Sequence, residues 1–353
     1  MRGWLGIAAS ALAASACAQT YPYADSRPPI EAQPTSPARI VSLADLPGWG
    51  DEDHVAALAA LRAACQVAHD PRLLAACAKA PADADEAAAR AFFETTFDAV
   101  EVGPAGRLTG YFMPVYEARI AEDDEFSAPV RPKPADLPPA NLSAAGRAPY
   151  DTRAQIESRP APDALAWMRP EDLFFMQVQG AGVLNFPDGR RAKAVFAGTN
   201  GAAFVGIAAP MRERGLLADQ DTSASAIHAW LAQHRGPDAI AIMDLDPRYV
   251  FYSLTADDGL EPSGSAGARL PTGRAVAVDP AWHAMGELLW IDGETPTLAG
   301  AFPTYRRLVA ALDTGGAIKG QARADLYLGR WPAAGQEAGR IRHQLTLWRL
   351  TPR

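Results

Sequence analysis

The pattern of hydrophobic and polar positions divides the chain into a helical first third and a largely β-rich remainder. Val55, Leu58 and Leu61 recur at three-residue steps, which is the spacing of one helix face. Acidic residues that can cap a helix precede several such segments. Helices are therefore expected at 53–68, at 72–79, after a cap by Asp83 or Asp85, and at 219–234.

Beyond residue 249, short apolar runs alternate with Gly, Pro and Asp. Strands of this length and spacing predict a small closed barrel rather than a parallel sheet. Asp188-Gly189 lies between two further apolar runs, 173–176 and 194–197, and predicts a hairpin turn. The strands expected in the barrel are 249–254, 275–278, 288–291, 308–312, 325–328 and 345–350.

The N-terminus has the pattern of an export signal. Arg2 precedes an apolar run that is too short to span a membrane, so residues 1–18 are interpreted as a signal peptide. Small residues before Cys17 resemble a lipoprotein cleavage site, which would leave a lipidated Cys17; cleavage after Ala18 would instead release a soluble protein. Residues 19–40 are rich in Pro and are expected to form a tether. The chain would then touch a membrane only through a lipid anchor.

Composition narrows the functional classes. The 353 residues are 48% hydrophobic, enough for one large domain or two ordinary ones. The net charge of −8 argues against nucleic acid, which requires a basic surface. The six histidines show no metal-ligand spacing, so no metal is predicted. Cys65 and Cys77 either form a disulfide in an exported protein or are two buried thiols.

Three acids stand at the ends of predicted strands. Asp313 is followed closely by Gly315 and Gly316, Asp325 begins another strand, and Asp279 precedes a proline. Paired glycines are expected to turn the backbone sharply and to let a ligand approach. Each acid taken alone could equally be a turn residue, because Asp beside Gly or Pro is common in turns.

Two kinds of chemistry compete for these acids. Asp313-Thr314-Gly315 is similar to the active-site loop of aspartic peptidases, which need two such carboxylates; this chain has one such loop and would have to dimerise through it. Glycoside cleavage is the other. Most hydrolases use two carboxylates, but a lytic enzyme can use one, because the C6 hydroxyl of the muramoyl sugar is already tethered to the carbon under attack.

Five blocks together resemble the lytic murein transglycosylase A family. They occur in the family's order and extend over roughly residues 105–345, and the Met-Gln-Val-Gln-Gly and Asp-Thr-Gly-Gly-Ala-Ile-Lys-Gly runs are the most specific. The blocks are 108–111, 174–182, 197–201, 273–280 and 313–329.

The resemblance implies a mainly β fold with N-terminal helices. It comprises a double-psi β-barrel domain and a second, inserted β domain, with the glycan in the groove between them. In this sequence the barrel would use 41–109, which is largely helical, and 246–353, the three-aspartate domain; the insert would be 110–245.

By the same resemblance, Asp325 is the acid that protonates the glycosidic oxygen, and Asp313 supports it. Asp325 must then keep a proton at neutral pH, so its pKa is expected to be raised. Tyr111, Tyr327 and Trp331 could stack on sugars, although strand aromatics are more often core. Gln and Asn in the blocks could instead satisfy backbone groups. The expected substrate-binding residues are Thr109, Tyr111, Gln177, Gln179, Gly180, Asn200, Gly315 and Gly316.

The implied activity is cleavage of the MurNAc-GlcNAc β-1,4 bond of peptidoglycan with formation of 1,6-anhydromuramic ends and no cofactor. The expected partners are glycan strands, with other cell-wall enzymes as further candidates, and the chain is expected to be a monomer. The expected location is the periplasm, anchored to the outer membrane. Two alternatives stay open: a hydrolase on the same fold that releases reducing ends, and an inactive glycan-binding protein.

Overall fold

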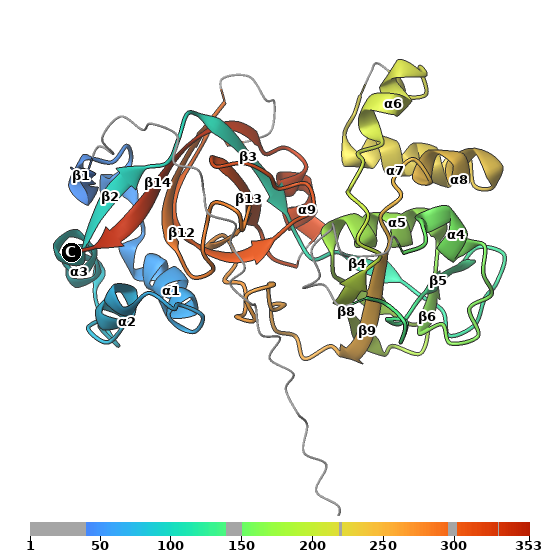
Figure 1. Ribbon diagram of the computed structural model, residues 1–353, viewed down its shortest axis with the longest axis horizontal. Helices are drawn as coiled ribbons and strands as arrows, with labels where there is room; N and C mark the ends of the chain where they lie inside the picture. Colours follow the sequence, from blue (N-terminus) through green and yellow to red (C-terminus); the bar gives the residue numbers. More distant parts are fainter. Residues whose placement is uncertain (1–39, 139–149, 219–220, 296–301, 331) are drawn as a thin grey trace, which may run out of the picture.

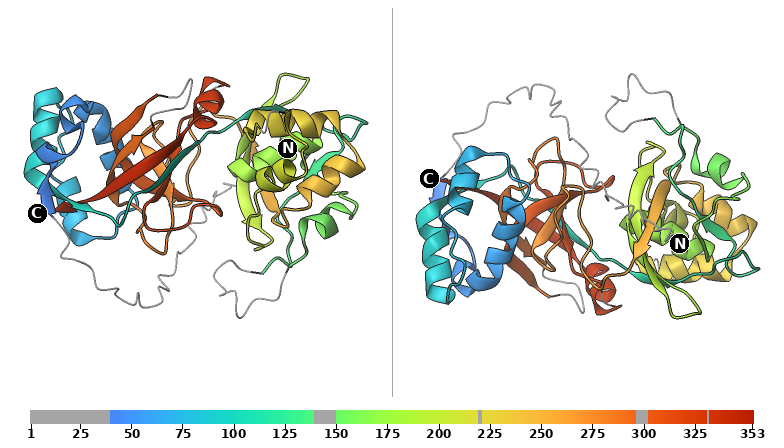
Figure 2. Two further views of the ribbon diagram at one scale, coloured as in Figure 1. Left: turned by 90° about the horizontal axis from the view of Figure 1, so that it is seen from above. Right: turned by 90° about the horizontal axis from the view of Figure 1, so that it is seen from below.

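The computed structural model describes residues 40–138, 150–218, 221–295, 302–330 and 332–353. A barrel with the N-terminal helices lies at one end of the molecule, and an insert with its own sheet lies at the other (Figures 1 and 2). The expected signal peptide with Cys17 (1–18), residues 19–39 of the expected tether, and Trp331 lie outside the described residues.

Six strands form the barrel. They follow the order β14-β11-β12-β10-β13-β3, and β3 pairs back onto β14, which closes the ring and confirms the predicted small barrel. Two further strands, β1 (Ile40–Ser42) and β2 (Phe97–Glu101), extend the sheet from β14. The barrel strands are β3 (Gly106–Tyr111), β10 (Ala275–Val278), β11 (Leu288–Glu294), β12 (Thr304–Thr314), β13 (Arg323–Tyr327) and β14 (Arg342–Pro352).

Side-chain alternation along these strands separates an apolar interior from an outer face. The interior cluster draws on all six strands, through Leu108, Val276, Leu289, Val309, Leu326 and Leu345 among others. Residues on either side of these positions point outward. Asp325, between buried Ala324 and Leu326, therefore belongs to the outer face.

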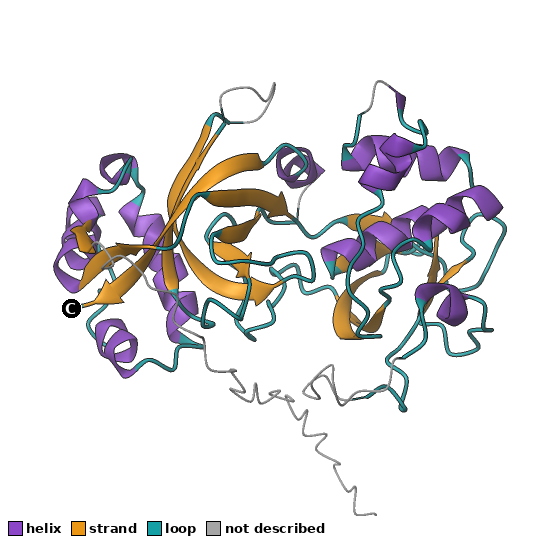
Figure 3. Ribbon diagram, turned by 45° about the horizontal axis from the view of Figure 1, so that its top comes forward, coloured by secondary structure: helices purple, strands orange, loops and turns teal. Residues whose placement is uncertain are grey.

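Three helices cover part of that outer face, as Figure 3 shows at the barrel's far end from the insert. They are α1 (His54–Cys65), α2 (Pro71–Cys77) and α3 (Glu86–Thr96). Their N-caps are Asp53, Asp70 and Asp85, so Asp85 rather than Asp83 caps the third. A core that includes Trp49, Trp290 and Leu308 lies between these helices and the barrel.

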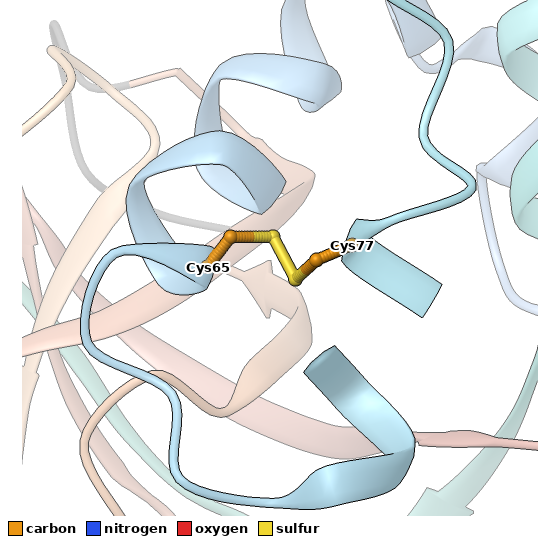
Figure 4. Close-up of a disulfide and its surroundings, with 2 residues drawn as sticks. All are labelled: Cys65 and Cys77. Carbon is orange, nitrogen blue, oxygen red and sulfur yellow. A yellow bond between two sulfur atoms is a disulfide. The ribbon is translucent and has the colours of Figure 1, made fainter. Parts of the chain in front are cut away.

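Cys65 and Cys77, at the ends of α1 and α2, form a disulfide in the structure (Figure 4). Their Cα atoms lie 5.9 Å apart, within the range that a disulfide requires. The bond joins two short helices that pack on the same core. Of the two states that the sequence allows, the structure has the disulfide.

The described part of the insert contains more helix than strand. Its four-stranded sheet has the order β4-β7-β8-β9, and β5 pairs with β6. The prediction of an inserted β domain is therefore correct for the sheet, but the helices of the insert were not predicted. The strands are β4 (Val115–Glu117), β5 (Ala128–Val130), β6 (Ala166–Met168), β7 (Gly182–Asn185), β8 (Arg191–Thr199) and β9 (Val250–Ala256). The helices are α4 (Arg153–Glu157), α5 (Pro170–Gln179), α6 (Ala208–Glu213), α7 (Ala224–Gln233) and α8 (Pro237–Met243); α9 (Pro332–Ala338) lies beside the barrel.

The apolar run 173–176 is part of helix α5, so its interpretation as a strand was wrong. Pro170 begins the helix and Gly180, at φ 86°, ends it. A short apolar run has the same appearance in a buried helix and a buried strand. The hairpin predicted at Asp188-Gly189 is confirmed, because this turn joins β7 to β8.

The chain leaves the barrel after β3, and β9 still pairs with β8 in the insert sheet. Its return to the barrel thus begins after Ala256, later than the division expected at 245/246. The strand that follows Asp246-Pro247 is β9, which hydrogen-bonds to β8 of the insert, so the expectation that 249–254 belongs to the barrel was wrong. Within the described ranges, no helix is both long and apolar enough to cross a membrane.

Candidate active site

Strand register brings the two acids into one row. Asp313, Ala277, Asp325 and Thr109 are paired successively across β12, β10, β13 and β3. The two acids are therefore two strands apart, about 10 Å between Cα atoms. A bulge opposite Val276/Ala277 shifts the β12 register by one residue, and this shift turns Asp313 to the outer face that carries Asp325.

A threonine holds one oxygen of Asp325. The Thr109 hydroxyl donates to Asp325 Oδ1 in a short hydrogen bond, and it accepts one from Arg323 Nη2 at 2.9 Å. Because Arg323 supplies the hydrogen on that side, the hydroxyl's own hydrogen is directed at the carboxylate. Oδ2 of Asp325 has no hydrogen-bond partner among the residues that the structure describes. The half-buried carboxyl group thus keeps one oxygen for a ligand.

Burial raises the pKa of Asp325 above that of an ordinary aspartate. The hydrogen bond from Thr109 and the positive charge of Arg323 act in the opposite direction, and the negative charge of Asp313 adds to the rise. The net direction is upward. This environment favours a carboxyl group that holds its proton longer than one in water would.

Asp313 has more donors than Asp325. Its Oδ1 accepts from the backbone N–H groups of Ser265 and Thr314, both at 2.9 Å, and its Oδ2 accepts from the Tyr111 hydroxyl at 2.8 Å. Burial raises the pKa of Asp313 and these three donors lower it, with a net direction that is upward, as for Asp325. Burial and the charge of Asp313 raise the pKa of Tyr111 far above its usual range, so this phenol remains a donor.

Tyr111 is itself positioned by Tyr327. The two rings are 5.2 Å apart, and the Tyr327 hydroxyl donates to Glu261 Oε2 at 2.5 Å. Both rings are on the outer face, two residues beyond Thr109 and Asp325 on their strands. Tyr327 is 1% exposed, which fits a core role better than sugar stacking.

Asp279 lies outside this row. Its carboxylate is 6% exposed and accepts from the backbone of Ala281 and of Gly320, the latter at 2.8 Å. These bonds fasten the loop after β10 to the loop between β12 and β13. The contacts of the third acid are therefore structural.

Two of the expected insert residues are buried in backbone networks. Asn200 is 3% exposed; its amide donates to the carbonyls of Asp151 and Pro247 and accepts from Tyr249 N–H. Gln177 is 2% exposed and donates to the Val250 carbonyl at 3.3 Å. In the structure these side chains join segments of the insert and lie apart from the acid row.

Gln179 and Gly180 lie nearer the barrel. Gln179 Oε1 accepts a hydrogen bond from Phe112 N–H, just after β3, at 3.4 Å. Gly180 ends α5 in the left-handed conformation, which glycine adopts readily. Both are half-exposed.

The two glycines after Asp313 form the expected turn, because the Ile318 N–H donates to the Gly315 carbonyl at 3.0 Å, although neither glycine has a left-handed φ. Gly316 is exposed, and a Cβ atom there would lie 3.5 Å from Arg248 Nε and 3.6 Å from Phe204 Cβ. The barrel loop therefore comes close to the insert at this glycine.

Sequence reasoning missed Arg323 and Ser265. The signal for Arg323 was present, because a residue two positions before Asp325 in a strand shares its face. No such signal exists for the backbone N–H of Ser265, which the long return from the insert brings to Asp313. Within the described residues, no group of three or more His, Cys, Asp or Glu could hold a metal. Two hollows of about 320 and 460 Å³ in the insert include no residue of the row.

Two family models match the chain. The MltA specific insert domain matches residues 107–253, and the 3D domain matches residues 274–351. These ranges coincide with the insert plus β3 and with the barrel strands β10 to β14.

Curated relatives give the same family. The chain is 34% identical over 255 residues to membrane-bound lytic murein transglycosylase A of Vibrio cholerae, and 35% identical over 249 residues to that of Escherichia coli. Each alignment covers 69% of this chain, and the chain spans 64% of the length of these relatives.

Solved structures of related proteins are similar to this chain over nearly the whole fold. The membrane-bound lytic murein transglycosylase of Agrobacterium tumefaciens has a TM-score of 0.75 at 29% identity, covering 89% of this chain and 97% of that one. Escherichia coli MltA with bound chitohexaose has a TM-score of 0.70 at 26% identity, with coverage of 91% and 96%. The chain therefore belongs to the membrane-bound lytic murein transglycosylase A family.

Proposed function

We propose that this chain is a peptidoglycan lytic transglycosylase and that Asp325 is its single acid and base. The observation that carries the proposal is the state of that carboxyl group: half-buried, with a raised pKa, held at Oδ1 by Thr109 and with Oδ2 available to a ligand. Family membership supplies the substrate class.

The reaction needs one proton donor that later becomes an acceptor. Protonated Asp325 donates from Oδ2 to the glycosidic oxygen, and the bond from C1 of the muramoyl sugar to that oxygen breaks. The resulting carboxylate takes the proton of the muramoyl C6 hydroxyl as O6 bonds to C1. The carboxyl group returns to its starting state, no water is consumed, and the product ends in 1,6-anhydromuramic acid.

Asp313 is proposed to remain the ionised member of the pair. It accepts three hydrogen bonds, whereas Asp325 accepts one, and donors stabilise the charged form. Its negative charge opposes ionisation of Asp325. Asp313 thus acts by keeping the proton on its neighbour.

We further propose that the barrel is of the double-psi type, supported by the two parallel pairs, β10–β12 and β13–β3, in an otherwise antiparallel ring. The glycan is proposed to lie between barrel and insert, with Thr109, Tyr111, Gln179, Gly180, Gly315 and Gly316 nearest to it. The chitohexaose bound by the Escherichia coli relative supports a sugar-binding role. Gln177 and Asn200 remain predictions as ligands, and their burial favours an indirect role.

The proposal extends to the location, anchoring, oligomeric state and partners of the protein. The protein acts in the periplasm as a monomer, anchored to the outer membrane through lipidated Cys17, and it requires neither cofactor nor nucleic acid. Glycan strands are its substrate, and other cell-wall enzymes are candidate partners. The membrane-bound relatives support the anchor.

Product analysis tests the proposed reaction. Purified sacculi are digested with the wild-type protein, and the muropeptides are separated and identified by mass spectrometry. Anhydromuropeptides are the expected product. Reducing ends would identify a hydrolase on the same fold, and an undigested sacculus that still binds the protein would identify a glycan-binding protein.

A further inference from the structure

Three arginines lie next to Asp325 on the outer face of the barrel, on β3, β13 and β14, which run side by side in Figure 1. Strand register arranges the region in two rows. The first row is Asp325, Thr109 and Arg342, and the second is Arg323, Arg107 and Gln344. We refer to Arg107, Arg323 and Arg342 as the arginine patch.

Asp325 attracts Arg323 electrostatically, but no close ion pair with a described residue offsets the positive charge of the patch. Arg107 and Arg323 are directly paired across β3 and β13, and like charges opposite one another destabilise a sheet. Among the described residues, none of the three arginines forms an ion pair; Arg323 donates instead to carbonyls and to Thr109. A ligand that supplies negative charge would offset the repulsion within this cationic cluster.

The arginine patch is a positively charged region on an acidic protein. The whole chain carries a net charge of −8, so the patch is a local exception. Arg107 and Arg342 are exposed to solvent. Asp221 lies within electrostatic range of Arg342, but its carboxylate accepts from Ser223 N–H at 2.8 Å, and Arg342 itself donates to the Thr222 carbonyl. The guanidinium groups of Arg107 and Arg342 therefore remain open to a ligand.

We propose that the arginine patch binds the carboxylates of the stem peptide on the muramoyl residue beside the cleaved bond. This inference rests on the proposed function. The sugar ring of GlcNAc is uncharged, whereas a stem peptide carries several carboxylates, which guanidinium groups bind in bidentate geometry. Arg342 is two strands from Asp325 in the same row, about 10 Å between Cα atoms, which is within reach of a peptide attached to the sugar at the acid.

The test compares two forms of one substrate. Glycan strands from a single sacculus preparation either keep their stem peptides or are stripped by an amidase, which leaves a free lactyl carboxylate. Initial rates are measured for the wild type, Arg107→Gln/Arg342→Gln, and Arg107→Lys/Arg342→Lys. Arg72→Gln, on exposed helix α2, is the control for loss of one surface charge.

On peptide-bearing strands, the double Gln variant is expected to lose roughly 4- to 25-fold in kcat/KM, mostly through KM, since one exposed charge pair contributes about two- to five-fold. The loss on stripped strands should be much smaller, and the Lys variant should recover most of the activity. Added salt should reduce the preference for peptide-bearing strands.

An equal loss on both substrates, or no loss on peptide-bearing strands, would overturn the proposal. A larger loss on stripped strands would also overturn it and would identify the lactyl carboxylate as the ligand. If the wild type cleaves neither form, the proposed function fails instead. In that case, cosedimentation of peptide-bearing strands with the wild type and with the double Gln variant tests separately whether the arginine patch binds the peptide.

Discussion

The barrel and the insert both contribute polar side chains from the segments that resemble the family, yet they use them differently. On the barrel, Thr109, Asp313 and Asp325 are half-buried on one outer face, and Asp325 keeps an oxygen free. In the insert, Gln177 and Asn200 are almost fully buried, and their amides hydrogen-bond to backbone groups. A shared motif therefore does not imply a shared role.

The difference has a physical cause. A carboxyl group can transfer a proton only if a ligand reaches it, so it must remain partly exposed. A buried amide with two donors and an acceptor is well suited to join loops that would otherwise leave backbone groups unpaired. Substitutions should consequently impair catalysis on the barrel and stability in the insert.

The largest effect is expected for Asp325→Asn. Loss of a general acid should reduce kcat by about 10²- to 10⁴-fold. Because the folded-state pKa of Asp325 is raised, its ionised form costs stability at neutral pH. The variant should therefore unfold at an equal or higher temperature at pH 7, and this advantage should vanish as the pH falls below the unfolded pKa. Exposed Asp124→Asn is the matched control. If Asp325→Asn loses activity only in proportion to the fraction of protein that is unfolded, Asp325 is not the general acid.

Asn200→Ala should destabilise the insert. It removes hydrogen bonds to Asp151, Pro247 and Tyr249, and leaves the buried Tyr249 N–H without its acceptor, whereas the Pro247 carbonyl keeps the Arg153 N–H as a donor. We expect a loss of about 2–4 kcal/mol in the free energy of unfolding, measured in urea. Asn185→Ala, at an exposed strand end, is the control. Unchanged stability with lost activity would show that Asn200 contacts the glycan.

Thr109→Val should show a smaller, purely functional effect. The valine keeps the shape but removes the donor to Asp325 and the acceptor for Arg323. A loss of roughly 5- to 100-fold in kcat/KM is expected, with little change in melting temperature. Thr95→Val on helix α3 is the control. If both variants retain wild-type rates, Thr109 does not orient the acid.

The smallest effect is a shift in the pH profile. If Asp325 is the general acid as proposed, activity requires its protonated form, and the rate falls as the pH rises through its pKa. Asp313→Asn removes a negative charge that raises this pKa, and the alkaline limb should move to lower pH. Arg323→Gln removes a charge that lowers it, and the limb should move to higher pH. Profiles of kcat/KM measure both; shifts in one common direction would be inconsistent with this electrostatic arrangement.

The sequence predicted the elements better than their pairing. Short apolar runs located the barrel strands β10 to β14, and the acid caps located α1 to α3, because these signals are local. The run 249–254 was assigned to the barrel but lies in the insert sheet, and barrel strand β3 was not predicted. The helix at 173–176 was missed because a run of four apolar residues has no distinguishing period. The bulge that turns Asp313 outward and the Ser265 N–H that binds it depend on register and on the distant return of the chain, which local patterns do not encode.

The central claim is that Asp325 holds a proton at a pH where an ordinary aspartate is ionised. Carbon NMR titration of protein labelled at the aspartate carboxyl groups, wild type against Asp325→Asn, measures this directly. We expect one resonance that titrates above the ordinary aspartate pKa of about 3.9 and that is absent from the variant. A resonance of Asp325 that titrates at or below that value would contradict it.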